Sequence, residues 1–234
     1  MSQNNSMIGI EKYLKNRKNI FDVGTGPNGS DWWKNVDTDT QITGCDLYFF
    51  PKNPPDNVKI FKYDASKLNH LNRFSNLEIY QNNNHFIRQR INLVNKFDMV
   101  VANHVLEHVK SPANLIKGIS KLIKKNGIVY IGFPESTNFT DIFYHLIHAE
   151  GGGHIQKLTK DIIENLFLKN SFKTLHLGKW PDDWRWFEEQ FDFKGRNIKY
   201  TNQKEISYIA EVFRKELTLK KGYFYGWEMV FKKL

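Results

Sequence analysis

The stretch Ile20-Phe21-Asp22-Val23-Gly24-Thr25-Gly26-Pro27-Asn28-Gly29 decides the fold of this chain. A short apolar run ends in an acid and passes directly into a glycine-rich turn. Glycine lets a turn approach a ligand because no Cβ stands in the way, and a helix that begins just after the turn offers free N–H groups. The pattern is typical of a parallel strand that delivers its backbone to a nucleotide-like ligand.

Strands and helices alternate on both sides of this turn. Because the connections have the length of helical crossovers, we predict an α/β, Rossmann-like, doubly wound sheet. It has seven mainly parallel strands and an antiparallel last strand, in a single domain over residues 1–234 with substrate-side insertions near 66–95, 134–158 and 178–200. The predicted strands are 19–23, 41–46, 58–62, 97–102, 128–133, 172–177 and 222–231. The predicted helices are 8–16, a helix that Ser30 caps, 66–95 with an inserted loop, 112–125, 159–169 and 203–219.

The composition is that of a folded, water-soluble chain. Of its 234 residues, 40% are hydrophobic and 25% charged, and no apolar run approaches the ~20 residues that cross a bilayer. The single cysteine, Cys45, excludes an internal disulfide, so we expect the cytoplasm and no membrane partner. The net charge of +9 favours an anionic partner, although a lysine- and asparagine-rich codon bias explains it equally well.

The glycines also match a dinucleotide-binding pattern. Gly24, Gly26 and Gly29 spell G-x-G-x-x-G, and the acid Asp46 follows at the end of the next strand. In that pattern the residue two before the first glycine is apolar, whereas here it is Asp22. A carboxylate there would repel a pyrophosphate and would suit a cationic amino group. S-Adenosylmethionine has an ammonium, a sulfonium and no phosphate, so Asp22 favours that donor.

Residues 20–135 resemble a class I S-adenosylmethionine-dependent methyltransferase of the small-molecule type. The motifs are the Asp22-x-Gly24-x-Gly26 turn, Gly44-Cys45-Asp46-Leu47, Tyr63-Asp64-Ala65, and Phe97-Asp98-Met99-Val100 running into Asn103-His104-Val105-Leu106-Glu107-His108-Val109. In that family the turn cradles the methionine moiety, the second-strand acid binds the ribose and the third-strand acid binds the adenine, while residues after the fourth strand lie beside the methyl group. The resemblance implies these donor-binding residues: Asp22, Gly24, Gly26, Asn28, Asp46, Leu47, Asp64, Ala65, Asn103 and His104. Asn28 stands where many members carry a third glycine.

A cluster of histidines follows the fourth predicted strand. His104, Glu107 and His108 share one face of a helical turn and match H-x-x-E-H, the inverted zinc-protease signature. The motif directly follows a strand of a βαβ array, which disfavours a protease. Some relatives that methylate hydroxyls hold a divalent ion here with a Glu-His pair and a further histidine, and the resemblance makes Glu107, His108 and His154 (or His148) the metal candidates. Alternatively, Glu107 and His108 are structural, or His108 or His154 acts as an unassisted general base.

The resemblance implies methyl transfer, and we expect a small, anionic or sugar-like acceptor that is methylated at oxygen. The acceptor is expected to meet Tyr13, residues 134–158 and the aromatic stretch 180–189, which alternatively forms a homodimer interface. The strongest rival is an RNA-directed methyltransferase that acts on a ribose 2′-hydroxyl and is metal-assisted. A non-catalytic donor-binding subunit and a nicotinamide-dependent oxidoreductase are further alternatives.

Overall fold

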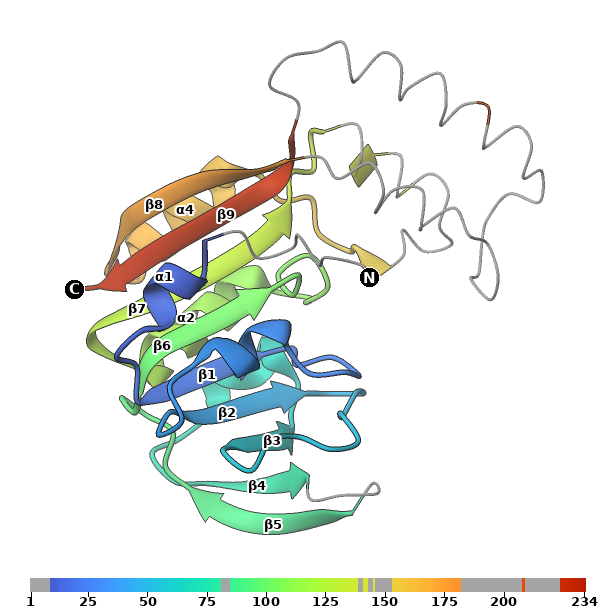
Figure 1. Ribbon diagram of the computed structural model, residues 1–234. Helices are drawn as coiled ribbons and strands as arrows, with labels where there is room; N and C mark the ends of the chain where they lie inside the picture. Colours follow the sequence, from blue (N-terminus) through green and yellow to red (C-terminus); the bar gives the residue numbers. More distant parts are fainter. Residues whose placement is uncertain are drawn as a thin grey trace.

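The computed structural model describes residues 9–80, 85–138, 141, 142, 145, 153–181, 208 and 224–234. Within these ranges one nine-stranded sheet has the order β5-β4-β3-β2-β1-β6-β7-β9-β8 (Figure 1). Its strands are β1 (Asn19–Val23), β2 (Gln41–Asp46), β3 (Val58–Lys62), β4 (Ser75–Tyr80), β5 (Phe86–Ile91), β6 (Phe97–Asn103), β7 (Ile123–Pro134), β8 (Phe172–Pro181) and β9 (Phe224–Lys233). The α-helices are α1 (Glu11–Leu14), α2 (Pro112–Leu122) and α4 (Lys160–Lys169), and the 3₁₀ helices are η2 (Asp31–Asn35) and η3 (Ala65–His70). No helix in the described ranges is both long and apolar enough to span a bilayer.

The central strands β3, β2, β1, β6 and β7 are parallel, and β9 runs antiparallel between β7 and β8. The chain moves outward from β1 to β3 on one side and resumes with β6 on the other. A doubly wound sheet binds its ligand at the carboxyl ends of its strands, where the strand order reverses. The predicted seven-stranded sheet with an antiparallel last strand is confirmed, and two further strands extend it.

Those two strands correct the prediction for residues 66–95, which are not a helix with an inserted loop. After the short η3, strands β4 and β5 form an antiparallel hairpin on the free edge of β3. The sequence Phe86-Ile87-Arg88-Gln89-Arg90-Ile91 lacks the two-residue alternation of apolar and polar residues that predicts a half-buried strand. The alternation is absent because β5 is largely exposed, so burial selects no apolar face.

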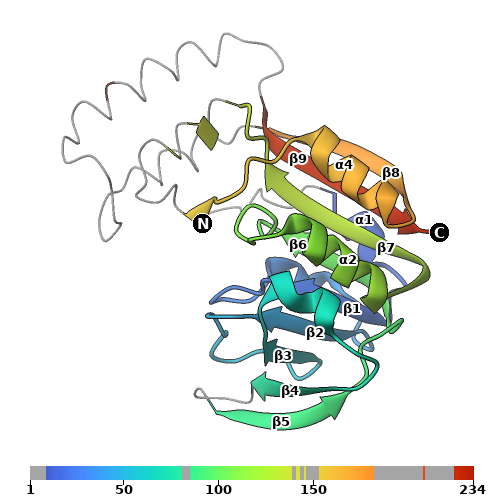
Figure 2. The same cartoon turned by 180° about the vertical axis from the view of Figure 1, so that it is seen from behind.

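Helices cover both faces of the sheet (Figures 1 and 2). Helices α2, α4 and η3 lie on one face, where Phe21, Val100 and Ile131 belong to the larger apolar core. Helices α1 and η2 lie on the other, where Ile20 and Tyr130 belong to a second core. The two cores alternate residue by residue along the middle of β6 and β7, as the two-residue period of a strand requires.

The helix that follows β6 begins as predicted but ends early. The Ser111 side chain caps α2 by accepting a hydrogen bond from the Asn114 N–H, and Pro112 occupies the first turn. The helix stops at Leu122 rather than Lys125, because Ile123 already pairs with Phe97 as the start of β7. The predicted helix 159–169 is confirmed as α4, and the Thr159 hydroxyl caps it by accepting a hydrogen bond from the Ile162 N–H. The predicted helix 203–219 and the insertion beyond residue 181 lie outside the described residues.

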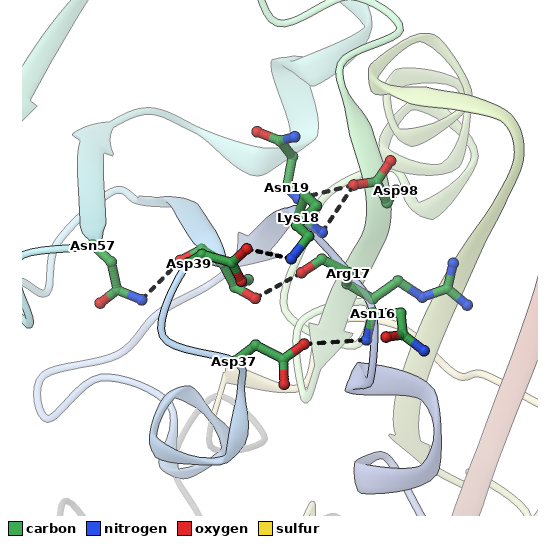
Figure 3. A network of polar contacts seen from close by, with 9 residues as sticks. Asn16, Arg17, Lys18, Asn19, Asp37, Asp39, Asn57 and Asp98 are labelled. Atoms are coloured by element: carbon green, nitrogen blue, oxygen red, sulfur yellow. Dashed lines mark hydrogen bonds and ion pairs between the residues drawn. The ribbon is translucent and has the colours of Figure 1, made fainter.

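A polar network holds the amino ends of the central strands, at the opposite edge from the glycine turn (Figure 3). Asp98 Oδ2 accepts hydrogen bonds from the backbone N–H groups of Lys18 (3.1 Å) and Asn19 (2.9 Å). Its Oδ1 accepts from Lys124 Nζ at 2.7 Å, and Lys18 Nζ pairs with Asp39. The network joins the starts of β1, β6 and β7, so it sets the strand register far from the candidate site.

Candidate functional site

The glycine turn follows β1 and adopts a backbone that most residues avoid. Gly24, Gly26 and Gly29 have φ values of 73°, 68° and 74°. A Cβ on Gly24 would meet Val105 at 2.6 Å, and one on Gly29 would meet the ring of Trp33. A Cβ on Gly26 would meet nothing within 4 Å. Two of these three glycines therefore serve packing, whereas Gly26 borders open space. Asn28 is exposed in the same turn.

Asp22 sits beneath this turn, and its carboxylate is only 2% exposed. Its Oδ2 accepts hydrogen bonds from Ser30 Oγ at 2.6 Å and from Trp33 Nε1 at 2.8 Å. Ser30 makes no side-chain cap for η2, which corrects the predicted role, because its hydroxyl is used on Asp22. Burial raises the pKa of Asp22 from 3.8 to about 7, although the two donors act against that rise. A cationic ligand group beside Asp22 would favour the ionised form of its carboxylate. The donor-binding role of Asp22 stays a prediction.

Asp46 ends β2 and ties two loops together. Its Oδ2 accepts from the Gly26 N–H at 3.0 Å, and its Oδ1 accepts from the N–H groups of Tyr48 and Phe49 at 2.9 Å. Each carboxylate oxygen has two lone pairs, so ribose hydroxyls can still bind. Leu47 is half-buried beside it. The acid thus holds the open glycine turn against the end of β2.

Asp64 lies just beyond β3, at the start of η3. Its Oδ1 accepts from the backbone N–H of Ser66 at 2.9 Å and from its hydroxyl at 2.6 Å, so the side chain caps that helix. Ala65 is half-buried and packs against the larger core. The predicted adenine acid is therefore at the expected strand end, where it has a structural role as well.

At the end of β6 the chain turns sharply. The Oδ1 of Asn103 is buried and has no hydrogen-bond partner among the described residues. His104 follows with a left-handed φ of 53°, and its N–H donates to the Gly132 carbonyl at 2.9 Å. Its ring lies 4.8 Å from the ring of Trp180 and 6.1 Å from that of Tyr225. The left-handed residue directs the following turn back across the strand ends.

That turn brings Glu107 and His108 into the cluster. Glu107 is 1% exposed; one carboxylate oxygen lies 3.0 Å from His104 Nδ1, and Oε2 is buried with no partner in the described ranges. Burial alone would raise the pKa of Glu107, but the hydrogen bond from His104 and the neighbouring imidazoles hold it below its ordinary value. His108 Nδ1 lies 2.8 Å from the Gly153 carbonyl, and burial lowers the pKa of His108.

His154 completes the cluster from beyond β7. Its ring centroid is 4.8 Å from that of His108, and its Nδ1 lies 2.8 Å from Asp141 Oδ1. Asp141 is itself buried, and His145 Nε2 approaches its other oxygen at 3.6 Å. The structure therefore brings together the three metal candidates, Glu107, His108 and His154, while His148 lies outside the described residues. Asp141 and His145 were missed because nothing in the local sequence separates them from other polar loop residues.

Comparisons with known proteins agree with this geometry. A family model described as a methyltransferase domain matches residues 8–206, so the chain belongs to that family. Similar structures include an S-adenosylmethionine-dependent methyltransferase from Archaeoglobus fulgidus, with 15% identity, coverage of 96% of this chain and 91% of that chain, and a TM-score of 0.57. Another is 1,6-didemethyltoxoflavin-N1-methyltransferase from Burkholderia thailandensis with bound S-adenosylhomocysteine, at 13% identity, 99% and 77% coverage and a TM-score of 0.56. A third is the [4+2]-cyclase SpnF, at 13% identity, 94% and 76% coverage and a TM-score of 0.57. The comparison with curated proteins finds no match.

The chain is therefore a methyltransferase by family, which contradicts the oxidoreductase alternative. The site fits the donor. Gly26 borders open space. The Oγ1 of Thr25, in the same turn, and the Oδ1 of Asn103 are both buried and have no hydrogen-bond partner in the described part of the chain. Buried polar atoms that lack partners cost stability, which a bound polar ligand recovers.

Proposed function

We propose that this methyltransferase transfers its methyl group to a hydroxyl oxygen of a small, anionic or sugar-like acceptor. The observation that carries the proposal is the cluster in which His154, from beyond β7, joins Glu107 and His108, which lie in the turn after β6. A neutral amine is already a nucleophile, whereas a hydroxyl has to lose its proton as it attacks. A buried carboxylate with two imidazoles supplies that proton acceptor.

In this mechanism the donor half and the acceptor half of the site have separate tasks. The open turn at Gly26 admits the methionine moiety, Asp46 binds the ribose and Asp64 the adenine. The sulfonium is already activated, so the remaining work is to align acceptor oxygen, methyl carbon and sulfur. His154 receives the acceptor proton at Nε2, because its Nδ1 is hydrogen-bonded to Asp141. In the alternative in which Glu107, His108 and His154 hold a divalent ion, His154 would be a ligand rather than the base, and the ion would lower the pKa of the acceptor hydroxyl.

The net charge of +9 supports an anionic acceptor. The cytoplasm is the proposed compartment, because the single cysteine, Cys45, is a buried free thiol. A homodimer through the aromatic stretch 180–189 stays a prediction that lies almost entirely outside the described residues.

A second candidate is methylation of an RNA ribose 2′-hydroxyl. The β4–β5 hairpin favours it, because the Arg90 guanidinium lies 4.9 Å over the exposed ring of Phe74, and Arg88 is 82% exposed. Cations interleaved with exposed rings suit single-stranded nucleic acid. RNA binding whose log K falls steeply with log salt concentration would favour this candidate, whereas no measurable RNA affinity would exclude it.

The test incubates the full chain with methyl-labelled S-adenosylmethionine and fractions of small anionic and glycosylated metabolites, and identifies products by NMR. We expect a methyl ether. His154→Ala should abolish turnover while S-adenosylhomocysteine still binds in calorimetry, and the exposed His85→Ala should match the wild type. A labelled N-methyl product that His154→Ala still forms at the wild-type rate would overturn the proposal.

A further inference from the structure

We propose that Trp180 is a plug that the methyl donor has to displace, so that the fraction of molecules in which this side chain has moved away helps to set the donor affinity. The ring of Trp180 covers Asn103, the residue at the end of β6 that is predicted to lie beside the methyl group. Because the plug concerns the donor, it holds whichever acceptor atom is methylated and is tested separately from the proposed O-methylation.

Trp180 reaches the site from the edge of the sheet. It stands near the end of β8, which β9 separates from β7, and its cross-strand partner on β9 is Gly226 (Figure 1). The six-membered part of its ring lies over Gly132, since a Cβ on Gly132 would overlap ring atoms Cζ2 and Cη2. The same Cβ would overlap Asn103 Oδ1. The indole edge and the amide oxygen therefore share the space that a side chain at residue 132 would fill.

This contact leaves two buried polar atoms unpaired. Asn103 Oδ1 and Trp180 Nε1 are both buried and have no hydrogen-bond partner among the described residues. The ring atoms beside Gly132 and the amide oxygen are carbons, so they cannot replace a hydrogen-bond donor. An unpaired buried donor and acceptor cost free energy of the same order as the gain from burying a large apolar side chain. The covering position of Trp180 is therefore weakly held, and a ligand can shift it.

The indole N–H acts on one neighbouring group, the hydroxyl of Tyr130. Burial and Glu228 raise the pKa of Tyr130, and the N–H of Trp180 opposes that rise. Tyr130 donates its proton to Glu228 Oε2 at 2.8 Å, while Trp180 Nε1 does not reach hydrogen-bond geometry with any described residue. A shift of the ring that brings Nε1 into range would give the indole N–H an acceptor.

The local sheet does little to clamp the ring. The pairing of β8 with β9 changes register directly after Trp180, and irregular strand ends of this kind are over-represented next to active sites. Gly178, two residues earlier on the same face of β8, and the cross-strand Gly226 have no side chains to hold it. The ring packs instead on His104, with 4.8 Å between the two ring centroids. Displacement of Trp180 would therefore uncover His104 together with Asn103.

The experiment measures S-adenosylhomocysteine binding to the full chain by calorimetry. A ligand that binds only the open form has a dissociation constant raised by the reciprocal of the open fraction. Trp180→Phe keeps an aromatic ring near His104 but shortens the edge that reaches Asn103, and Trp180→Ala removes the plug. We expect the dissociation constant to fall ~3–30-fold in both variants. Trp32→Phe is the matched control and should bind as the wild type does, because Trp32 is also buried with an unpartnered Nε1 in the described ranges but packs in the second core.

Acrylamide quenching of tryptophan fluorescence gives a readout that does not depend on affinity. Saturation with S-adenosylhomocysteine should raise the accessible tryptophan fraction of the wild type and of Trp32→Phe, because Trp180 leaves its buried position. Trp180→Phe should show no such increase. Urea titration checks that each variant unfolds cooperatively, and Trp180→Phe carries the test if Trp180→Ala does not fold.

An unchanged or weaker affinity of folded Trp180→Phe would overturn the inference, because a side chain that only packs beside the donor loses contacts when it is shortened. An equal gain in Trp32→Phe would also overturn it, as would a wild type whose tryptophan accessibility does not change on binding. A chain that shows the plug behaviour and yields only N-methyl products would disprove the acceptor chemistry and leave the role of Trp180 standing.

Discussion

Replacing Asp22 with asparagine should stabilise the protein and weaken donor binding at the same time. The pKa of Asp22 rises from 3.8 in the unfolded chain to about 7 in the fold. The folded state therefore binds this proton more tightly than the unfolded state does. The contribution of protonated Asp22 to the unfolding free energy is lost as pH rises from about 4 to about 7. The ionised side chain costs about 4 kcal/mol at pH 8 and about 2 kcal/mol at pH 5 by the linkage relation.

Asparagine avoids this cost because it is neutral and nearly the same shape. Its Oδ1 can accept from Ser30 Oγ and Trp33 Nε1 as the carboxylate does. Urea denaturation of donor-free protein should show Asp22→Asn more stable than the wild type by about 4 kcal/mol at pH 8, with the gap roughly halved at pH 5. A variant that is less stable than the wild type at pH 8 would refute the reasoning about Asp22.

The same variant tests whether the charge serves the donor. A hydrogen bond to a charged group contributes ~1.5–3 kcal/mol, so calorimetry with S-adenosylhomocysteine should show a dissociation constant raised roughly 10- to 100-fold. An unchanged dissociation constant would make Asp22 a purely structural residue.

Three further substitutions probe other parts of the molecule. Asp46→Ala removes the acid at the end of β2 and should weaken S-adenosylhomocysteine binding by about 1–3 kcal/mol in calorimetry; an unchanged constant would remove Asp46 from the site. Gly118→Ala places a Cβ 2.5 Å from the Cβ of Leu68, where α2 crosses η3, and should lower the unfolding free energy by about 1–3 kcal/mol in urea titrations; a stability gain would contradict the close packing. Asp98→Asn removes the ionised carboxylate that accepts a hydrogen bond from Lys124. Lys124 and the two backbone donors hold the pKa of Asp98 below its ordinary value. Because that stability is present above about pH 4 and lost as pH falls further, the deficit of Asp98→Asn should be clear at pH 7 and shrink below pH 4, with donor affinity unchanged throughout.

The places of the three acids predicted to bind the donor could be predicted because their signals are local. Each acid stands directly after an apolar run, so Asp22, Asp46 and Asp64 could be assigned to strand ends without knowing any tertiary contact. What the sequence could not show is how those acids are used within the fold. Ser30 was expected to cap a helix, yet a hydroxyl 2.6 Å from Asp22 serves the buried carboxylate instead.

The missed features depend on contacts between distant segments. Asp141 contacts His154 because residues 153–155 lie at the turn of Glu107, where the Glu107 carbonyl accepts from the N–H of Ile155 at 2.9 Å. The hairpin at β4 and β5 was missed for another reason. Its outer strand is exposed, so burial imposes little on its sequence, and the regular succession of strands and helices favoured a helix there.

The candidate site draws its parts from three separate stretches of the chain. The groups predicted to meet the nucleoside come from the ends of β1, β2 and β3, Glu107 and His108 come from the turn after β6, and Asp141, Gly153 and His154 come from beyond β7. Exchanging the last stretch alone would therefore leave Glu107 and His108 behind. A graft designed to move the proposed acceptor chemistry to a relative has to carry the turn after β6 as well.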